Sequence, residues 1–330
     1  MRGPYRIFGA EMSPYSIKVR AYFRYKDIPH EWLSRRTNEE EFQKYARLPI
    51  VPLVVTPDGK GIQDSTPIIE KLDEAFPEPS IHPEEPALNF LSALIEEYGD
   101  EWGNKLMFHH RWYGEADQLA TAHVLARGGM PYAPWEKVNK AAEMVRERMV
   151  SRVHFTGSSP ENAPLISAYF DRLLEILKPH LVARKYLFGA RPAFADFGLG
   201  SQVYEMALDP TAGAIIRARA PEVLAWAYRM TEPRNDGPFE NWESLKPTLN
   251  PLLCDAGDFF LPWSIANAKA LAVGDETFSV TLGGKAYVQG SQKYHARSLK
   301  VLRERYAAIA DKSELGPILE ASGCLKFLAY

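Results

Sequence analysis

The sequence predicts an α/β domain followed by a mainly helical region, and three observations lead to this fold class. Strand and helix signals alternate through the first eighty residues, a proline-rich connector follows at 77–86, and helical spacing dominates after it. A chain of 330 residues is long for one compact core and comfortable for two domains with an appendage. We therefore expect three units, at residues 1–80, 86–235 and 236–330.

The first unit is expected to run strand, helix, strand, helix, strand, strand, helix. The strands are predicted in the runs "YRIFGA", "PHEWLSR" and "IVPLVVT" and after the turn "PDGKG"; the helices are predicted in "SPYSIKVRAYFRYKDI", "NEEEFQKYAR" and "STPIIEKLDEAF". Pro52 lies inside the third strand, where proline cannot donate a hydrogen bond. A cis peptide bond before Pro52, at a strand edge, resolves this conflict.

Helical spacing continues beyond the connector. Apolar residues between Leu91 and His109 fall on one stripe, and further helices are expected near 134–155, 162–182, 194–208 and 221–231. A second break in the helical pattern is expected at 231–251. The last part is predicted to hold helices at 257–271 and 291–310 around a hairpin that turns at Gly283-Gly284.

Composition excludes several functional classes. The formal charge of -3 provides no electrostatic footprint for nucleic acid or an anionic membrane. No apolar run approaches the roughly 18 residues of a membrane helix, and the first residues lack the apolar core of a secretory signal. The two cysteines, Cys254 and Cys324, form neither a disulfide framework nor a metal-ligand spacing. We therefore expect a cytoplasmic protein without nucleic-acid or membrane partners.

Ser13 stands before the first predicted helix and allows two interpretations. Serine is a preferred N-cap and proline suits the first helical position, so Ser13-Pro14 is an ordinary helix start. The same helix end offers free N–H groups and partial positive charge, which stabilise an anionic group such as a thiolate. Because no cysteine lies nearby, a reactive sulfur would have to arrive with a ligand.

The order of three motifs resembles the cytosolic glutathione S-transferase family of the serine type. "SPYS", then "IVPLV", then "QDSTPIIEKLDEAFP" are similar to its thioredoxin-like N-terminal domain. "YLFGARPAFADFGLGSQVYEMAL" resembles the central helix of its all-helical second domain. The resemblance covers residues 1 to about 235 and leaves the C-terminal extension unassigned.

The resemblance implies a role for each matching residue. Ser13 would donate a hydrogen bond to the glutathione sulfur. Ser16, one turn later, would be a second donor, with packing or capping of the helix as the favoured alternative. Val51, before Pro52, would pair its backbone with the cysteinyl part of glutathione. Asp64 would face the γ-glutamyl ammonium, and Ser65 would meet the carboxylate with its hydroxyl and backbone N–H.

Two positions depart from the family pattern. A basic residue often precedes the Val-Pro strand and holds the glycine carboxylate, but this chain has Leu48-Pro49-Ile50 there, which leaves Arg47 or Lys44 as substitutes. In the helical domain, the usual serine or threonine cap that partners Asp196 is Ala193. Asp196 can still interact with the helix start.

A stripe on the first helices beyond the connector is a candidate for the electrophile pocket. The equivalent helix of the family borders that pocket, so Trp102, His109 and Trp112 could line it together with Tyr15; the alternative is that the stripe packs in the core or at a subunit interface. The adjacent His109 and His110 diverge on a helix and cannot share a metal, so we expect no metal cofactor.

The sequence therefore predicts a glutathione transferase-like enzyme. Glutathione would be the co-substrate, its thiolate would attack a small, hydrophobic electrophile, and the family resemblance implies a homodimer. Two alternatives stay open: a non-catalytic scaffold that acts through protein partners, and glutathione-dependent ether cleavage or dehalogenation. Disulfide exchange is disfavoured because Ser13 and Ser16 occupy both positions of a redox cysteine pair.

Overall fold

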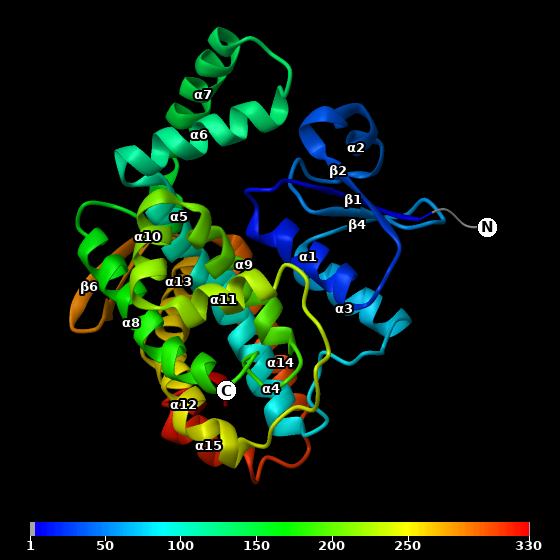
Figure 1. The fold of residues 1–330 in the computed structure, drawn as a ribbon. Coiled ribbons are helices and arrows are strands. Elements are labelled where there is room, and N and C mark those ends of the chain that lie inside the picture. Colours follow the sequence, from blue (N-terminus) through cyan, green and yellow to red (C-terminus); the bar gives the residue numbers. More distant parts are fainter. Residues whose placement is uncertain (1–3, 330) are drawn as a thin grey trace.

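A computed structural model describes residues 4–329 and places a four-stranded sheet with its helices beside a larger helical body (Figure 1). The first unit has the predicted order of strands and helices, with one short 3-10 turn added at Arg35–Thr37. Its elements are β1 (Tyr5–Gly9), α1 (Pro14–Tyr25), β2 (His30–Ser34), α2 (Glu39–Tyr45), β3 (Leu53–Val55), β4 (Gly61–Gln63) and α3 (Ser65–Ala75).

The sheet has the strand order β2-β1-β3-β4, which is thioredoxin-like. β1 is parallel to β2 and antiparallel to β3, and β3 is antiparallel to β4. Since parallel neighbours need a crossover, α1 connects β1 to β2. Side chains alternate across the sheet: Ile7 and Val54 join the main core, while Phe8 and Leu53 pack with Phe42 in a smaller cluster on the other face.

The second region is helical, as predicted. Its centre is α9 (Phe194–Leu208), which is buried along nearly its whole length and contacts α1 of the sheet domain. Asp196 accepts a hydrogen bond from the Ala193 N–H at 2.9 Å, so the helix start is capped although residue 193 has no side-chain oxygen. The other helices here are α4 (Pro86–Glu97), α5 (Asn104–Trp112), α6 (Glu115–Gly129), α7 (Trp135–Val150), α8 (Ala163–Ala183), α10 (Pro210–Arg219) and α11 (Pro221–Arg229).

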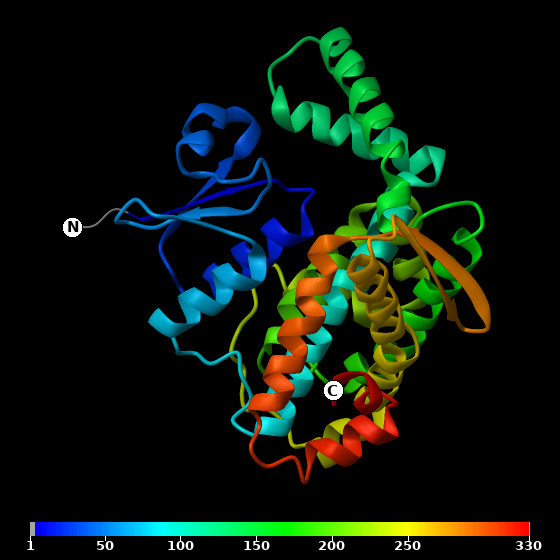
Figure 2. The ribbon, with the colours of Figure 1, turned by 180° about the vertical axis from the view of Figure 1, so that it is seen from behind.

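The last part of the chain packs on this helical body. The hairpin turns at Gly283-Gly284, as predicted, with positive φ at both glycines. α14 (Lys293–Ala308) runs alongside α4 (Figure 2). The elements are α12 (Trp242–Asp255), α13 (Leu261–Val273), β5 (Thr277–Leu282), β6 (Lys285–Gly290), α14 (Lys293–Ala308), α15 (Leu315–Ala321) and α16 (Leu325–Leu328).

The predicted break in helical structure at 231–251 is wrong for about half of its length. Residues 231–251 were expected to lack regular structure, but α12 begins at Trp242. The Asn241 side chain caps this helix by accepting from the Ser244 N–H at 3.0 Å. Pro247 and Pro251 lie inside α12, although proline normally disfavours a helix interior.

None of the helices within residues 4–329 combines the length and the apolar character needed to span a bilayer.

Candidate active site

The sheet brings the three sequence motifs to one edge. β1 and β3 are antiparallel with Phe8 opposite Leu53, so the end of β1 lies beside the start of β3. β3 and β4 are antiparallel with Leu53 opposite Gln63, so the end of β4 lies there too. The segments that leave or enter the sheet at this edge contain Ser13, Val51-Pro52 and Asp64-Ser65.

Ser13 caps α1 and keeps a hydrogen to donate. Its Oγ accepts from the Ser16 N–H at 3.3 Å, and its backbone is extended, as expected for an N-cap followed by Pro14. The Ser13 side chain is partly exposed, whereas Ser16 is fully buried and its hydroxyl has no partner within residues 4–329. Ser13 is therefore the accessible hydroxyl at this helix end.

The loop before β3 is held by Gln63. Its Oε1 accepts from the N–H groups of Arg47 and Leu48 at 2.7 and 3.0 Å, and its Nε2 donates to the carbonyls of Leu48 and Ile50 at 2.9 and 3.0 Å. The following Val51–Pro52 peptide bond is cis, as predicted. The backbone N–H and C=O of Val51 make no hydrogen bond within residues 4–329, so both can pair with a bound peptide.

Asp64 joins β4 to α3 in an unusual conformation. Its φ of 80° lies in the left-handed region, which residues other than glycine seldom adopt and which often marks functional sites. Its side chain makes no capping hydrogen bond to α3 and instead meets the Tyr294 hydroxyl of α14. Ser65 is buried and its hydroxyl donates to Asp100 at 3.4 Å, so the hydroxyl expected to meet a ligand carboxylate is already engaged.

A buried ion cluster ties the sheet domain to the helical body beneath this edge. Lys18 Nζ donates to Asp100 Oδ2 at 2.6 Å, to Thr66 Oγ1 at 2.8 Å and to the Glu96 carboxylate. Burial acts to lower the pKa of Lys18, but the charges of Asp100 and Glu96 outweigh it and raise that pKa. Burial raises the pKa of Glu96 to about 7 against the opposing effect of Lys18. Sequence reasoning missed this cluster, because no local pattern marks its members.

A cavity of about 370 Å³, here called the acidic cavity, opens at the same edge. Its wall combines the cis-proline segment, the start of α3, the end of α4 and one face of α14. The lining residues are Tyr15, Ile50, Val51, Pro52, Asp64, Thr66, Pro67, Glu70, Glu97, Asp100, Glu101, Tyr294, Arg297, Ser298 and Val301. Val51, Pro52 and Asp64 thus meet at one cavity, and Ser13 begins the helix that places Tyr15 in its wall.

A neighbouring hollow of about 380 Å³, here called the loop cavity, adjoins it. Arg47 lines this hollow with an exposed side chain. Lys71 of α3 and Arg297 of α14 line the same hollow.

The four residues expected at an electrophile pocket are not gathered together. Tyr15 lines the acidic cavity, and its hydroxyl donates to the Asp100 carbonyl at 3.0 Å. Trp102, His109 and Trp112 are 2%, 3% and 2% exposed and are absent from that lining. Burial lowers the pKa of His109 to about 4, and its Nδ1 lies 2.7 Å from the Ser158 hydroxyl. These three side chains therefore pack the helical body.

Arg111, which sequence reasoning did not single out, supports the loop before Ser13. Its guanidinium donates to the Met12 carbonyl at 3.1 Å, while Glu205 and Asp209 hold it at 2.7 and 2.9 Å. Burial acts to lower the pKa of Arg111, but the two carboxylates outweigh it and raise that pKa. The helical body thereby holds the backbone at Met12, directly before Ser13, in place.

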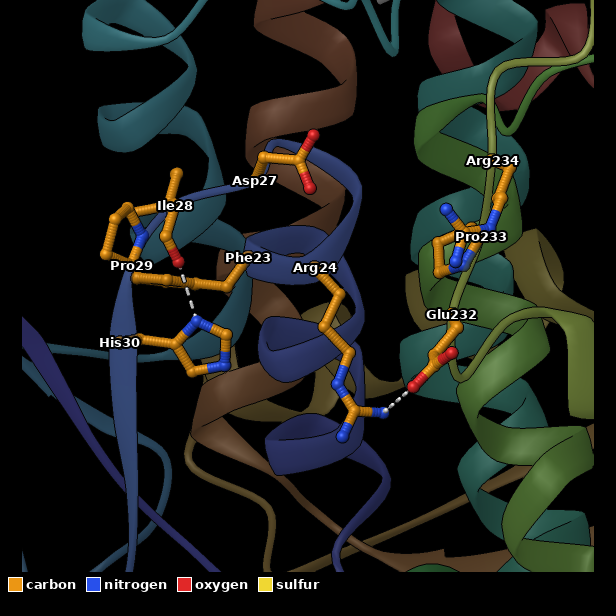
Figure 3. Close-up of a pocket in the computed structure, with 9 residues that line it drawn as sticks. All are labelled: Phe23, Arg24, Asp27, Ile28, Pro29, His30, Glu232, Pro233 and Arg234. Carbon is orange, nitrogen blue, oxygen red and sulfur yellow. Dashed lines mark hydrogen bonds and ion pairs between the residues drawn. The ribbon is translucent and has the colours of Figure 1, made fainter.

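Another hollow, of about 440 Å³, lies between the end of α1 and the segment 232–234 (Figure 3). Arg24 in its wall is engaged, because it pairs with Glu232 at 3.8 Å and donates to the Thr231 carbonyl at 2.9 Å. None of the motif residues at the sheet edge lines this hollow. Among residues 4–329, no group of three or more acidic, histidine or cysteine side chains is placed to hold a metal ion.

Two comparisons match glutathione S-transferases over part of this chain. A family model described as "Glutathione S-transferase, N-terminal domain" matches residues 7–80. A probable glutathione S-transferase of Oryza sativa subsp. japonica is 25% identical over 107 residues, which are 30% of this chain and 45% of that protein. The chain thus matches less than half the length of this relative.

Two solved structures align with much of this chain at low sequence identity. A glutathione S-transferase from Rhodospirillum rubrum F11 is 20% identical, with 76% of this chain and 91% of that chain covered and a TM-score of 0.46. The beta-etherase LigF from Sphingobium sp. strain SYK-6 is 18% identical, with 69% and 95% covered and the same TM-score of 0.46.

Proposed function

We propose that the chain is a glutathione S-transferase-like protein, which binds glutathione at the sheet edge and activates the thiol for attack on a small electrophile. The observation that carries this proposal is the convergence of Ser13, cis Val51–Pro52 and Asp64-Ser65 at one edge of the sheet. A helix cap alone would not require the unused backbone groups of Val51 or the left-handed Asp64.

Each group has a role that its geometry permits. The Ser13 hydroxyl already accepts from Ser16, so its hydrogen is free to donate to the glutathione sulfur. The N–H and C=O of Val51 pair with the cysteinyl backbone in the manner of a short β-strand. The Asp64 carboxylate takes the γ-glutamyl ammonium, and the Ser65 N–H at the start of α3 takes a carboxylate.

The reaction is a nucleophilic substitution or addition at carbon. The thiol proton leaves to water, and the Ser13 hydroxyl and the start of α1 stabilise the thiolate that remains. The sulfur electron pair forms the S–C bond, and in a substitution the leaving group departs with the electrons of its former bond. The chain's contributions are a lowered thiol pKa and two reactants held in contact.

The electrophile is proposed to enter the acidic cavity beside the cis-proline segment. Tyr15, Pro67 and Val301 provide apolar wall, which suits a small hydrophobic molecule. Ether cleavage and dehalogenation begin with the same thiolate. They differ from the proposed reaction only in the group that leaves, an alkoxide or a halide.

Thiolate absorbance tests the proposal directly. Purified protein with saturating glutathione is titrated from about pH 5 to about pH 9, where free thiols titrate near 8.5. A bound thiol that titrates well below this value supports binding and activation. Binding without a lowered pKa would favour the alternative of a glutathione-holding scaffold, and absence of binding would refute the proposed function.

A homodimer in the cytoplasm completes the proposal. Light scattering coupled to gel filtration should give a mass close to twice the 37.3 kDa of one chain. A mass of one chain at micromolar concentration would contradict it.

A further inference from the structure

One face of α14 forms a wall of the candidate site, although this helix lies more than two hundred residues after it in sequence. Tyr294 lies three and four residues before Arg297 and Ser298, and Val301 lies four and three residues after them, so all four share one side of the helix. All four line the acidic cavity, and Tyr294 and Arg297 also line the loop cavity.

α14 is held firmly in this position. Leu299 and Leu302 are 3% and 0% exposed and join the main core. The Ser298 hydroxyl donates to the Glu97 carboxylate of α4, and Arg305 forms an ion pair with Glu70 of α3. These contacts fix α14 against both the sheet domain and the helical body, so its side chains stand at defined places in the cavity wall.

Arg297 is an unpaired cation in an acidic wall. Its side chain is exposed, and its guanidinium makes no hydrogen bond or ion pair within residues 4–329. The five carboxyl groups that line the acidic cavity contact other side chains instead. These pairs are Asp64 with Tyr294, Glu70 with Arg305, Glu97 with Ser298, Asp100 with Lys18 and Glu101 with His295.

Glutathione has two carboxylates and one ammonium group, and the motif residues Asp64 and Ser65 serve only two of these three charged groups. The Ser65 N–H serves one carboxylate, and Asp64 serves the ammonium. An arginine fork matches a carboxylate in shape and charge. We propose that Arg297 of α14 binds a carboxylate of the tripeptide thiol, so that the C-terminal part of the chain completes the substrate site; this inference rests on the proposed function.

The surrounding carboxyl groups oppose an anionic ligand less than their number suggests. Burial and the neighbouring charge of Glu96 raise the pKa of Glu97 to about 8, which weakens its negative charge toward a bound anion. Burial also raises the pKa of Asp100, whose remaining charge is offset by Lys18. Among the residues that line the acidic cavity, Arg297 is the one basic side chain, and its exposed guanidinium is the group available to a carboxylate there.

Calorimetric titration of the full-length protein tests the inference. The ligands are glutathione, its monoethyl ester with the glycyl carboxylate blocked, and 4-aminobutyryl-cysteinyl-glycine, which lacks the γ-glutamyl carboxylate. The variants are Arg297→Ala, the loop-cavity variants Arg47→Ala and Lys71→Ala, and Lys300→Ala as a matched control from the exposed side of α14. Thermal unfolding of each variant checks that the fold is kept.

Arg297→Ala should weaken glutathione binding about tenfold or more, as expected for a charge-assisted hydrogen bond. The weakening should disappear with the one analogue that lacks the partner carboxylate, which identifies that carboxylate. Lys300→Ala should bind like the wild type.

Three results would overturn the inference. Equal affinity of Arg297→Ala and wild type for glutathione overturns it alone and leaves the proposed function standing. The same penalty with both analogues overturns it too, because the effect would then not depend on a carboxylate. If the wild type binds no glutathione, the proposed function and this inference fail together.

Discussion

Replacing Ser13 with alanine should raise the pKa of the bound glutathione thiol by about one to two units. The variant loses one hydrogen bond from a neutral hydroxyl to a thiolate, and hydrogen bonds to charged groups contribute about 1.5–3 kcal/mol. One pKa unit corresponds to about 1.36 kcal/mol. The N–H groups at the start of α1 remain in the variant, so part of the stabilisation of the thiolate should survive.

The same substitution has a separate, smaller effect on folding. Ser13 caps α1 through one hydrogen bond of 3.3 Å. Loss of such a cap costs about 1 kcal/mol of unfolding free energy. Since the expected loss is small, the variant should remain folded during the titration, and any change in thiol pKa can be assigned to the site.

Ultraviolet thiolate absorbance measures this pKa, with Ser16→Ala as the matched control. Ser16 is buried and its hydroxyl has no partner within residues 4–329, so its removal should leave the thiol pKa nearly unchanged. A raised pKa in Ser16→Ala and an unchanged one in Ser13→Ala would show that the wrong serine is assigned. An unchanged pKa in both variants would reduce Ser13 to a helix cap.

Two further predictions concern buried lysines. Lys18→Met leaves Glu96 and Asp100 without their cation, and it should lower the free energy of unfolding, measured in urea, by about 3–5 kcal/mol. A loss below about 1 kcal/mol would mean that Lys18 and these carboxyl groups are not ionised in the folded protein. Lys105 is buried against the Trp263 ring and the Gln289 side-chain oxygen, and burial lowers its pKa far below the ordinary value. The unfolded chain then binds the extra proton, so wild-type stability should rise with pH up to about 10.4. Lys105→Met should remove that rise and be more stable at pH 7, and an identical stability–pH curve for both proteins would contradict this.

Local signals account for the parts of the fold that sequence predicted well. The hairpin turn depends on Gly283-Gly284, and the predicted limits of α9 match the structure at 194–208. Such features follow from a few neighbouring residues, whose backbone preferences act without help from the rest of the chain. α12 was missed because the local signals were misleading there: Pro247 and Pro251 normally disfavour a helix interior. Burial of four leucines nevertheless keeps the segment helical, namely Leu245, Leu249, Leu252 and Leu253.

The residues of the candidate site likewise fall into those that local sequence signals mark and those that such signals do not mark. Val51–Pro52 and Asp64 carry local signals, namely a proline within a β-branched run, which the structure places directly before β3, and an acid at a helix start. Lys18 and Asp100 are 82 positions apart, and no periodic pattern relates them. Arg297 is still further from the motifs that it faces. Contacts of this kind arise only when the helical body and the sheet domain pack together, so they could not be predicted from one sequence.

The C-terminal part of the chain is integral to the fold, and this decides how its function can be tested. One continuous core of buried residues extends from Ile7 in β1 to Leu328 in α16. Trp263 of α13 and Leu302 of α14 are both fully buried in it. Removing the segment after α11 would expose this apolar surface, and the resulting loss of stability would hide any loss of binding. Point substitution of an exposed side chain such as Arg297 avoids this problem, because it changes the cavity wall and leaves the buried face of α14 intact.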